Sequence, residues 1–121
     1  MATLLIVDDD DAIRGMLYDL LSDKYECDTA GMAEEALQYI EVVKYDAILT
    51  DIAMPGLSGI ELLEKIQEND ADTPVILISG KGSEQNPQAL LDLGAFAYVT
   101  KPFNLDELEE VVERAVTQKQ S

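Results

Sequence analysis

Five short apolar runs alternate with five segments of helical period along this chain, and this alternation limits the fold more than any other feature. The runs are rich in β-branched and aromatic residues, as strands are, and they cover residues 4–7, 25–30, 45–50, 75–78 and 96–100. The segments of helical period repeat apolar residues every three or four positions, and they cover residues 10–22, 33–42, 60–69, 87–94 and 104–117. Strands that alternate strictly with helices form parallel sheets with right-handed crossovers. We therefore predict an α/β fold, a doubly wound three-layer sandwich of five parallel strands and five helices.

Local signals in the second half of the chain support this prediction. Residues 75–78 are continuously apolar, which is typical of a central strand buried on both faces. Asn86-Pro87 predicts a helix start, with proline in the first turn. Asn104, with Glu107 three residues later, predicts another. We expect residues 118–121 to be a frayed tail, or the start of a linker to a further domain.

Composition excludes several classes of function. The 121 residues are enough for one domain, and 47% of them are hydrophobic, so the chain can bury a core. The net charge of −17 makes direct binding to nucleic acid or to a membrane unfavourable. No apolar run has the length of a membrane span or of a signal peptide, so we expect a cytoplasmic protein. Without histidine, and with Cys27 as the single cysteine, the chain has no Ser-His or Cys-His pair.

Polar residues follow the predicted strands where each strand ends. They are Asp8 and Asp9 after the first strand, Asp51 after the third, Ser79 closing the fourth and Lys101-Pro102 after the fifth. In doubly wound sheets, ligands bind outside the carboxyl ends of the strands. We therefore expect all of these residues to meet at one edge of the sheet.

Three clustered carboxylates need positive charge nearby. Like charges about 4 Å apart repel by about 4 kcal/mol at an effective dielectric of about 20. Lys101 and a divalent cation can offset this repulsion, and oxygen ligands favour Mg²⁺, with Mn²⁺ as a substitute. Such a site can hold a phosphoryl group while one carboxylate attacks it. Asp51 is the best nucleophile because it stands alone, whereas the adjacent Asp8 and Asp9 are better placed to share a cation.

With these residues in place, the chain resembles a response-regulator receiver domain of bacterial two-component signalling. The resemblance covers essentially the whole chain and rests on four ordered blocks: Leu5-Ile6-Val7-Asp8-Asp9-Asp10, Leu49-Thr50-Asp51-Ile52-Ala53-Met54-Pro55 with Gly59, Ile76-Leu77-Ile78-Ser79-Gly80, and Tyr98-Val99-Thr100-Lys101-Pro102-Phe103. It implies a flavodoxin-like sheet of strand order 2-1-3-4-5.

The resemblance also implies roles for the polar residues. Asp51 would accept a phosphoryl group from a histidine kinase or phosphotransfer protein, so the chain would be a signalling domain that catalyses only its own phosphorylation and dephosphorylation. Asp8 and Asp9 would hold Mg²⁺ together with Asp51 and the backbone carbonyl of Ala53. Lys101 would contact the phosphoryl group.

The expected signal is a change of surface. By the same resemblance, Ser79 is the switch hydroxyl and Tyr98 the aromatic residue that rotates behind it. Their movement would remodel the surface of the fourth helix, fifth strand and fifth helix, which would then contact a downstream effector protein or domain, with a phosphorylation-dependent homodimer as one alternative. Similarity further implies a cis peptide bond before Pro102.

Two positions differ from many relatives and lead to a prediction about lifetime. By the resemblance, Ala53 and Lys81 would occupy the family's variable positions beside the water that hydrolyses the acyl phosphate. Ala53 has no polar group to orient that water. We predict slower decay than in relatives with an amide and an acid there. The phosphoryl half-life of the Ala53→Asn, Lys81→Glu variant measures this effect, and a half-life equal to that of the unmodified chain would contradict it.

Two other functions fit parts of the sequence. A phosphohydrolase of the haloacid-dehalogenase type places its nucleophile in an Asp-x-Asp-x-Thr pattern, which residues 8–12 approach without the threonine. A phosphorylation-independent interaction module would use the same fold without the chemistry. Phosphoryl labelling at Asp8 would favour the first, and no labelling would favour the second.

Overall fold

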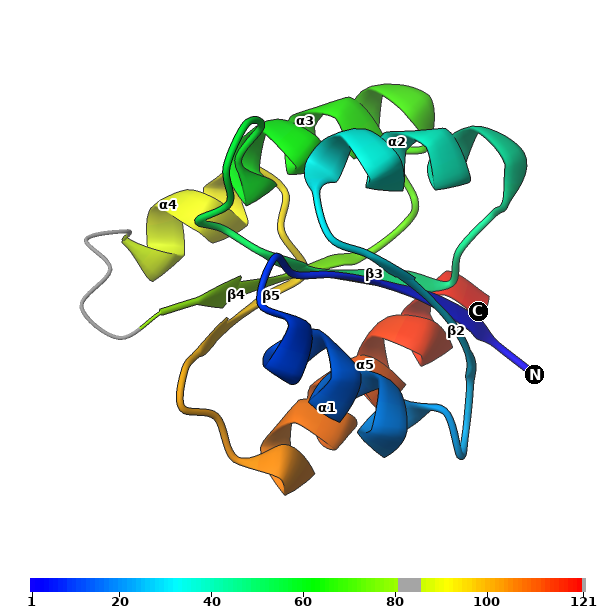
Figure 1. Ribbon diagram of the computed structural model, residues 1–121. Helices are drawn as coiled ribbons and strands as arrows, with labels where there is room; N and C mark the ends of the chain where they lie inside the picture. The colour runs from blue at the N-terminus through cyan, green and yellow to red at the C-terminus, as the bar shows by residue number, and fades with distance from the viewer. Residues whose placement is uncertain (81–85, 121) are drawn as a thin grey trace.

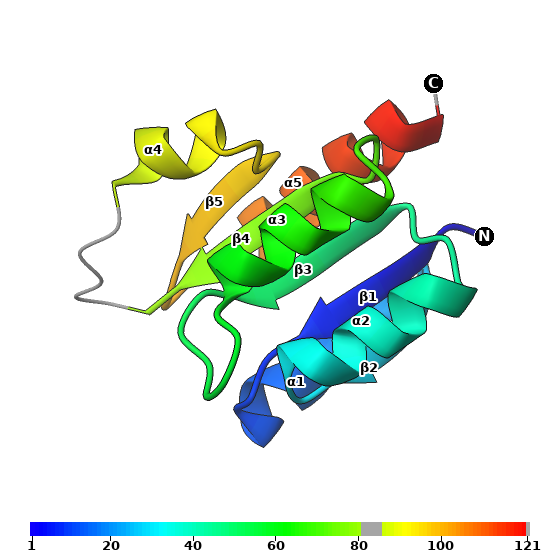
Figure 2. The same cartoon turned by 90° about the horizontal axis from the view of Figure 1, so that it is seen from above.

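A computed structural model describes residues 1–80 and 86–120 of the chain. Its sheet consists of five parallel strands in the order β2-β1-β3-β4-β5, which confirms the predicted fold and strand order. The strands are β1 (Thr3–Val7), β2 (Glu26–Ala30), β3 (Ala47–Asp51), β4 (Val75–Ser79) and β5 (Ala97–Thr100). All five therefore end at one edge of the sheet, as their arrowheads show in Figure 2.

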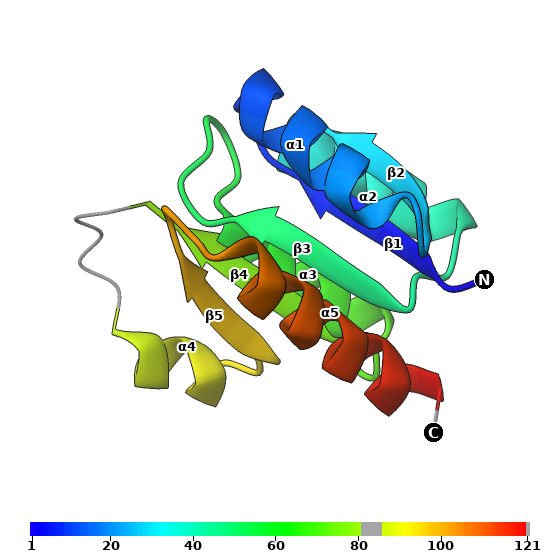
Figure 3. The ribbon, with the colours of Figure 1, turned by 90° about the horizontal axis from the view of Figure 1, so that it is seen from below.

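Five helices cover the two faces of this sheet. They are α1 (Asp11–Leu21), α2 (Ala33–Val42), α3 (Gly59–Asn69), α4 (Pro87–Asp92) and α5 (Leu105–Gln120). Helices α2, α3 and α4 lie on one face, and α1 and α5 lie on the other (Figures 1 and 3). The architecture is thus a sandwich of three layers with the sheet in the middle.

Each layer of helices has its own core, because alternate residues of a strand point to opposite faces. In β1, Leu5 and Val7 pack with α2 and α3, whereas Leu4 and Ile6 pack with α1 and α5. The same alternation continues in β3 and β4. Continuous apolar strands are therefore required here, which explains the unbroken run at residues 75–78.

Polar side chains cap the amino ends of four of the helices. Their oxygens accept hydrogen bonds from N–H groups that have no partner within the helix. The caps are Asp10 for α1, Ser58 for α3, Asn86 for α4 and Asn104 for α5. The structure confirms the two predicted helix starts at Asn86 and Asn104. Ser58 forms a reciprocal capping box with Glu61 that we did not predict.

The observed boundaries differ from the predicted ones at functional positions. Asp51 is the last residue of β3 rather than the first residue after it, whereas Ser79 closes β4 as expected. Helix α5 continues to Gln120, and so includes most of the segment expected from residue 118 to be a frayed tail or the start of a linker. The prediction that concerns Lys81 lies outside the described residues.

Candidate functional site

The end of β1 carries two aspartates into different environments. Asp8 is completely buried, and its main-chain N–H donates to the carbonyl of Ala30 at 3.1 Å. Its side-chain Oδ1 accepts a hydrogen bond from the N–H of Asp10 at 2.9 Å. Asp9 is exposed. The turn from β1 into α1 therefore fixes one carboxylate inside the protein and leaves its neighbour facing solvent.

Asp51 is the last residue of β3, the strand beside β1, and it is only 5% exposed. The Thr50 hydroxyl donates to the Asp51 carbonyl at 3.0 Å. The N–H of Gly59 donates to the carbonyl of Ile52 at 2.9 Å, and this contact brings the start of α3 against the end of β3. A side chain at Gly59 would have its Cβ 2.2 Å from the Asp51 carbonyl oxygen. The backbone around Asp51 is therefore held tightly on both sides.

The structure brings Asp8, Asp9 and Asp51 together. One carboxylate oxygen from each lies within 4.8 Å of the others. Lys101 completes the group, because its Nζ lies 3.2 Å from Oδ2 of Asp8 and 3.5 Å from Oδ2 of Asp51. Oxygen donors without nitrogen or sulfur ligands fit a hard cation such as Mg²⁺ or Mn²⁺. These three acidic residues are therefore the part of the described chain that suits a divalent cation.

Burial and neighbouring charges shift the pKa values of Asp51 and Lys101. Burial and the neighbouring Asp8 carboxylate raise the pKa of Asp51, and together they outweigh the opposing effect of Lys101. Burial acts to lower the pKa of Lys101, but the carboxylates of Asp8 and Asp51 raise it above its usual value. Lys101 is therefore a permanent ammonium at neutral pH. Its single positive charge faces the two negative charges of Asp8 and Asp51, so a further cation at the site would be electrostatically favourable.

The other predicted site residues lie in or just after β3, β4 and β5. Ser79 is buried at the end of β4, and its hydroxyl donates to the Gly80 carbonyl at 3.3 Å. Ala53 is exposed just beyond β3. Tyr98 is half-buried in β5, where it pairs with Leu77 and packs against the core of α2, α3 and α4. The Lys101-Pro102 peptide bond is cis, the geometry that the resemblance implies.

Two contributors to the site were missed in the sequence analysis. Gly59 appeared in a motif without a role, yet it makes room for the Asp51 backbone. Arg14, in α1, donates from Nη1 to the Asp8 carbonyl at 2.7 Å and was not considered at all. Its position could have indicated this contact, because Arg14 is the first basic residue of the chain and follows closely on a run of four aspartates.

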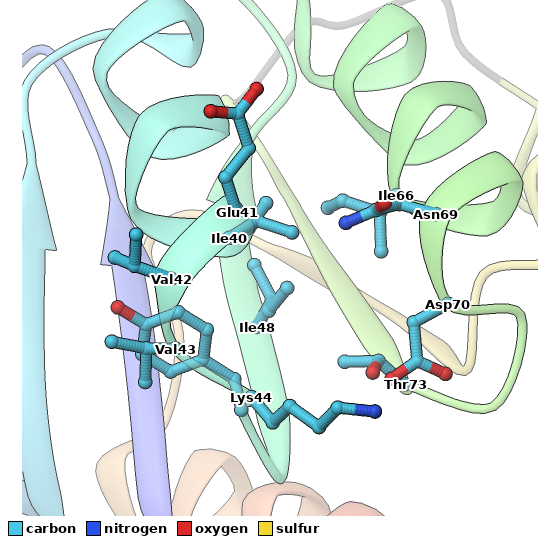
Figure 4. A pocket seen from close by; sticks show the side chains of 11 residues that line it. Ile40, Glu41, Val42, Val43, Lys44, Ile48, Ile66, Asn69, Asp70 and Thr73 are labelled. Atoms are coloured by element: carbon cyan, nitrogen blue, oxygen red, sulfur yellow. The ribbon is translucent and has the colours of Figure 1, made fainter.

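A separate cavity of about 330 Å³ lies at the opposite edge of the sheet, between the carboxyl ends of α2 and α3 (Figure 4). Ile40, Ile48 and Ile66 form part of its apolar lining, and Asp70 and Thr73 are among its polar residues. Because it lies at the amino ends of the strands, it is remote from the acidic cluster. The candidate site is therefore the cluster around Asp51 and not this cavity.

Comparisons with known proteins agree with this geometry. Residues 4–113 match the family model described as the response regulator receiver domain. The chain is 40% identical over 106 residues to the transcriptional regulatory protein DltR of Streptococcus agalactiae, covering 87% of this chain and 47% of DltR. It is 41% identical over 115 residues to the transcriptional regulatory protein KdpE of Staphylococcus aureus, covering 92% of this chain and 49% of KdpE. The chain thus spans about half the length of these two relatives.

Solved structures show the same fold. A response regulator receiver domain protein from Clostridium thermocellum superimposes with a TM-score of 0.92 at 31% identity, covering 99% of this chain and 98% of the other. A CheY-like receiver domain protein from Methanospirillum hungatei gives a TM-score of 0.91 at 34% identity, covering 99% and 97%. In residues 1–80 and 86–120, none of the helices has the length and apolar character that crossing a bilayer requires.

Proposed function

Because this chain belongs to the response regulator receiver domain family, we propose that it accepts a phosphoryl group on Asp51 and transmits the resulting change to a partner. The single observation that carries this proposal is the position of the Asp51 carboxylate. It lies at the carboxyl edge of the sheet, beside Asp8 and Asp9 and within 3.5 Å of the Lys101 ammonium. This arrangement combines a nucleophile with charges that bind phosphoryl oxygens.

In the proposed reaction, a carboxylate oxygen of Asp51 attacks the phosphorus of a phosphohistidine on a sensor kinase or phosphotransfer protein. A bond forms between this oxygen and phosphorus, and the bond between phosphorus and the imidazole nitrogen breaks. The electron pair of that bond stays on the imidazole, which takes up a proton. Lys101 moves from its carboxylate partners to a phosphoryl oxygen, which offsets the charge that arrives.

The donor set suits a magnesium ion as a cofactor. Asp8, Asp9, Asp51 and the Ala53 carbonyl would hold it, and all of them offer the oxygen ligands that Mg²⁺ prefers. When bound, Mg²⁺ neutralises phosphoryl oxygens and so makes the approach of an anionic nucleophile less costly. Asp8 is buried, so its carboxylate is held in place before any cation arrives.

The proposed signal is a shift between two arrangements of the α4-β5-α5 surface. Ser79 lies at the same sheet edge as Asp51, and Tyr98 is the half-buried aromatic residue of β5. We propose that Ser79 turns toward the new phosphoryl oxygens and that Tyr98 rotates inward behind it. The partner that binds this surface would be an effector domain or a separate protein in the cytoplasm, or a second copy of the chain. The names of DltR and KdpE, both transcriptional regulatory proteins, support an effector that acts on transcription.

Mass spectrometry after incubation with acetyl phosphate and Mg²⁺ tests the proposed acceptor. We expect a phosphoryl adduct in the unmodified chain and none in Asp51→Asn, because the amide is a poor nucleophile. Asp10→Asn is the matched control, since Asp10 caps α1 through its side-chain oxygen and should label normally. An adduct at Asp8 would point to a phosphohydrolase, and no adduct in the unmodified chain would point to a phosphorylation-independent module.

A further inference from the structure

Arg14 connects the start of α1 to the end of β1. Its Nη1 donates to the main-chain carbonyl of Asp8 at 2.7 Å, and its Nη2 pairs with the carboxylate of Asp11. The Arg14 side chain is 24% exposed. Its two partners differ in environment, because Asp8 is completely buried whereas the Asp11 side chain is 88% exposed. Ion pairs with exposed partners contribute little. The contact with the Asp8 carbonyl is therefore the one that matters for structure.

The carbonyl that Arg14 holds belongs to the peptide unit between Asp8 and Asp9. A peptide unit is planar, so fixing its oxygen also fixes the direction in which the chain leaves Asp8 and enters Asp9. The remaining polar groups of Asp8 contact Ala30, Asp10 and Lys101. Arg14 thus supplies the hydrogen bond that determines how the exposed Asp9 carboxylate is presented beside the buried one.

The turn after β2 leaves space for this guanidinium group. A Cβ added at Gly31 would lie only 3.3 Å from Nη1 of Arg14. Such a distance is tighter than ordinary van der Waals contact, so a larger residue at position 31 would press on the guanidinium group. Three segments, the end of β1, the first turn of α1 and the turn after β2, therefore meet at the Arg14 side chain.

We propose that Arg14 is a positioning residue for the cation site: it holds the Asp8-Asp9 peptide so that both carboxylates face Asp51. This inference rests on the proposed function, because it takes the three aspartates to be the Mg²⁺ ligands. Arg14 also carries a positive charge close to that site. By charge alone, removal of Arg14 would tighten cation binding. By position, its removal would weaken cation binding, so the two effects have opposite signs.

Calorimetric titration with MgCl₂ distinguishes these effects. We expect Arg14→Ala to bind Mg²⁺ at least fivefold more weakly than the unmodified chain, and Arg14→Lys to fall between them, because lysine keeps the charge and a single donor group. Arg114→Ala is the matched control, since it makes the same change on the exposed face of α5 and should bind normally. Equal or tighter binding by Arg14→Ala would overturn the proposal.

Hydrogen exchange provides a measurement that needs no metal. The Asp10 N–H donates to the Asp8 carboxylate, so its exchange reports the order of this turn. We expect this amide to exchange at least tenfold faster in Arg14→Ala than in the unmodified chain, and an unchanged rate would count against the proposal. An unmodified chain that binds no Mg²⁺ contradicts the proposed function, whereas normal Mg²⁺ binding by both Arg14 variants contradicts only the role of Arg14.

Discussion

Replacing Gly59 with alanine should lower the free energy of unfolding by about 3 kcal/mol, at the upper end of the usual cost of overpacking. The new Cβ would lie 2.2 Å from the carbonyl oxygen of Asp51 and 2.9 Å from the Cα of Ile52. Both atoms belong to the main chain, so no side chain can turn away to relieve the contact. Relief requires moving either the first turn of α3 or the end of β3. Urea denaturation followed by circular dichroism measures the change.

Gly15→Ala provides the control for this prediction. Gly15 lies in α1, and a Cβ there meets nothing within 4 Å. Alanine is favoured over glycine within helices by about 0.5–1 kcal/mol, so this variant should be more stable than the unmodified chain. The same chemical change is thus expected to have opposite signs at the two positions. Equal stability of the Gly59→Ala and Gly15→Ala variants would show that the close approach at β3 is not constraining.

Lys101→Ala should lower the free energy of unfolding by about 2–3 kcal/mol in buffer without divalent cations. Removing one partner from a buried ion pair usually costs about 3–5 kcal/mol, and the 19% exposure of the Lys101 side chain reduces that cost through solvent screening. Asp8 is completely buried and would lose its ammonium partner. The two carboxylates would then face each other with no positive charge from Lys101. Urea denaturation in the presence of a chelator gives the value.

The ion pair between Lys24 and Glu109 allows a matched comparison. Its atoms lie 3.4 Å apart, similar to the pairs of Lys101, but its side chains are 63% and 32% exposed. Exposed pairs contribute about 0.2–1 kcal/mol, so Lys24→Ala should cost less than Lys101→Ala. If both variants lose the same stability, burial of the acidic cluster does not strengthen its contacts with Lys101.

The layered fold could be predicted because its strands carry an unambiguous signal. The run from Val75 to Ile78 is apolar at every position, since its side chains enter both cores in turn. Alternation of strands and helices then fixes the parallel sheet, but several strand orders satisfy the same alternation. The order came from the resemblance and not from periodicity, because no local pattern specifies which strands are neighbours.

The acidic cluster could also be predicted, since the ends of parallel strands must meet at one edge. Asp8, Asp51 and Lys101 follow from that rule alone. Arg14 and Gly59 could not be predicted in the same way, because each acts on a main-chain carbonyl whose position depends on the path of a turn. The roles of Ser79 and Tyr98 stay predictions, because they concern a movement and not a position.

The alternation of side chains in β5 has a mechanical consequence. Tyr98 packs with the core beneath α4, and the next residue, Val99, packs with the core beneath α5. This strand lies at the edge of the sheet, where hydrogen bonds to β4 hold it along one side. Helices α4 and α5 have no core in common, so β5 is the element that contacts the cores of both. A small tilt of this four-residue strand would therefore change side-chain packing on both faces of the sheet at the same time.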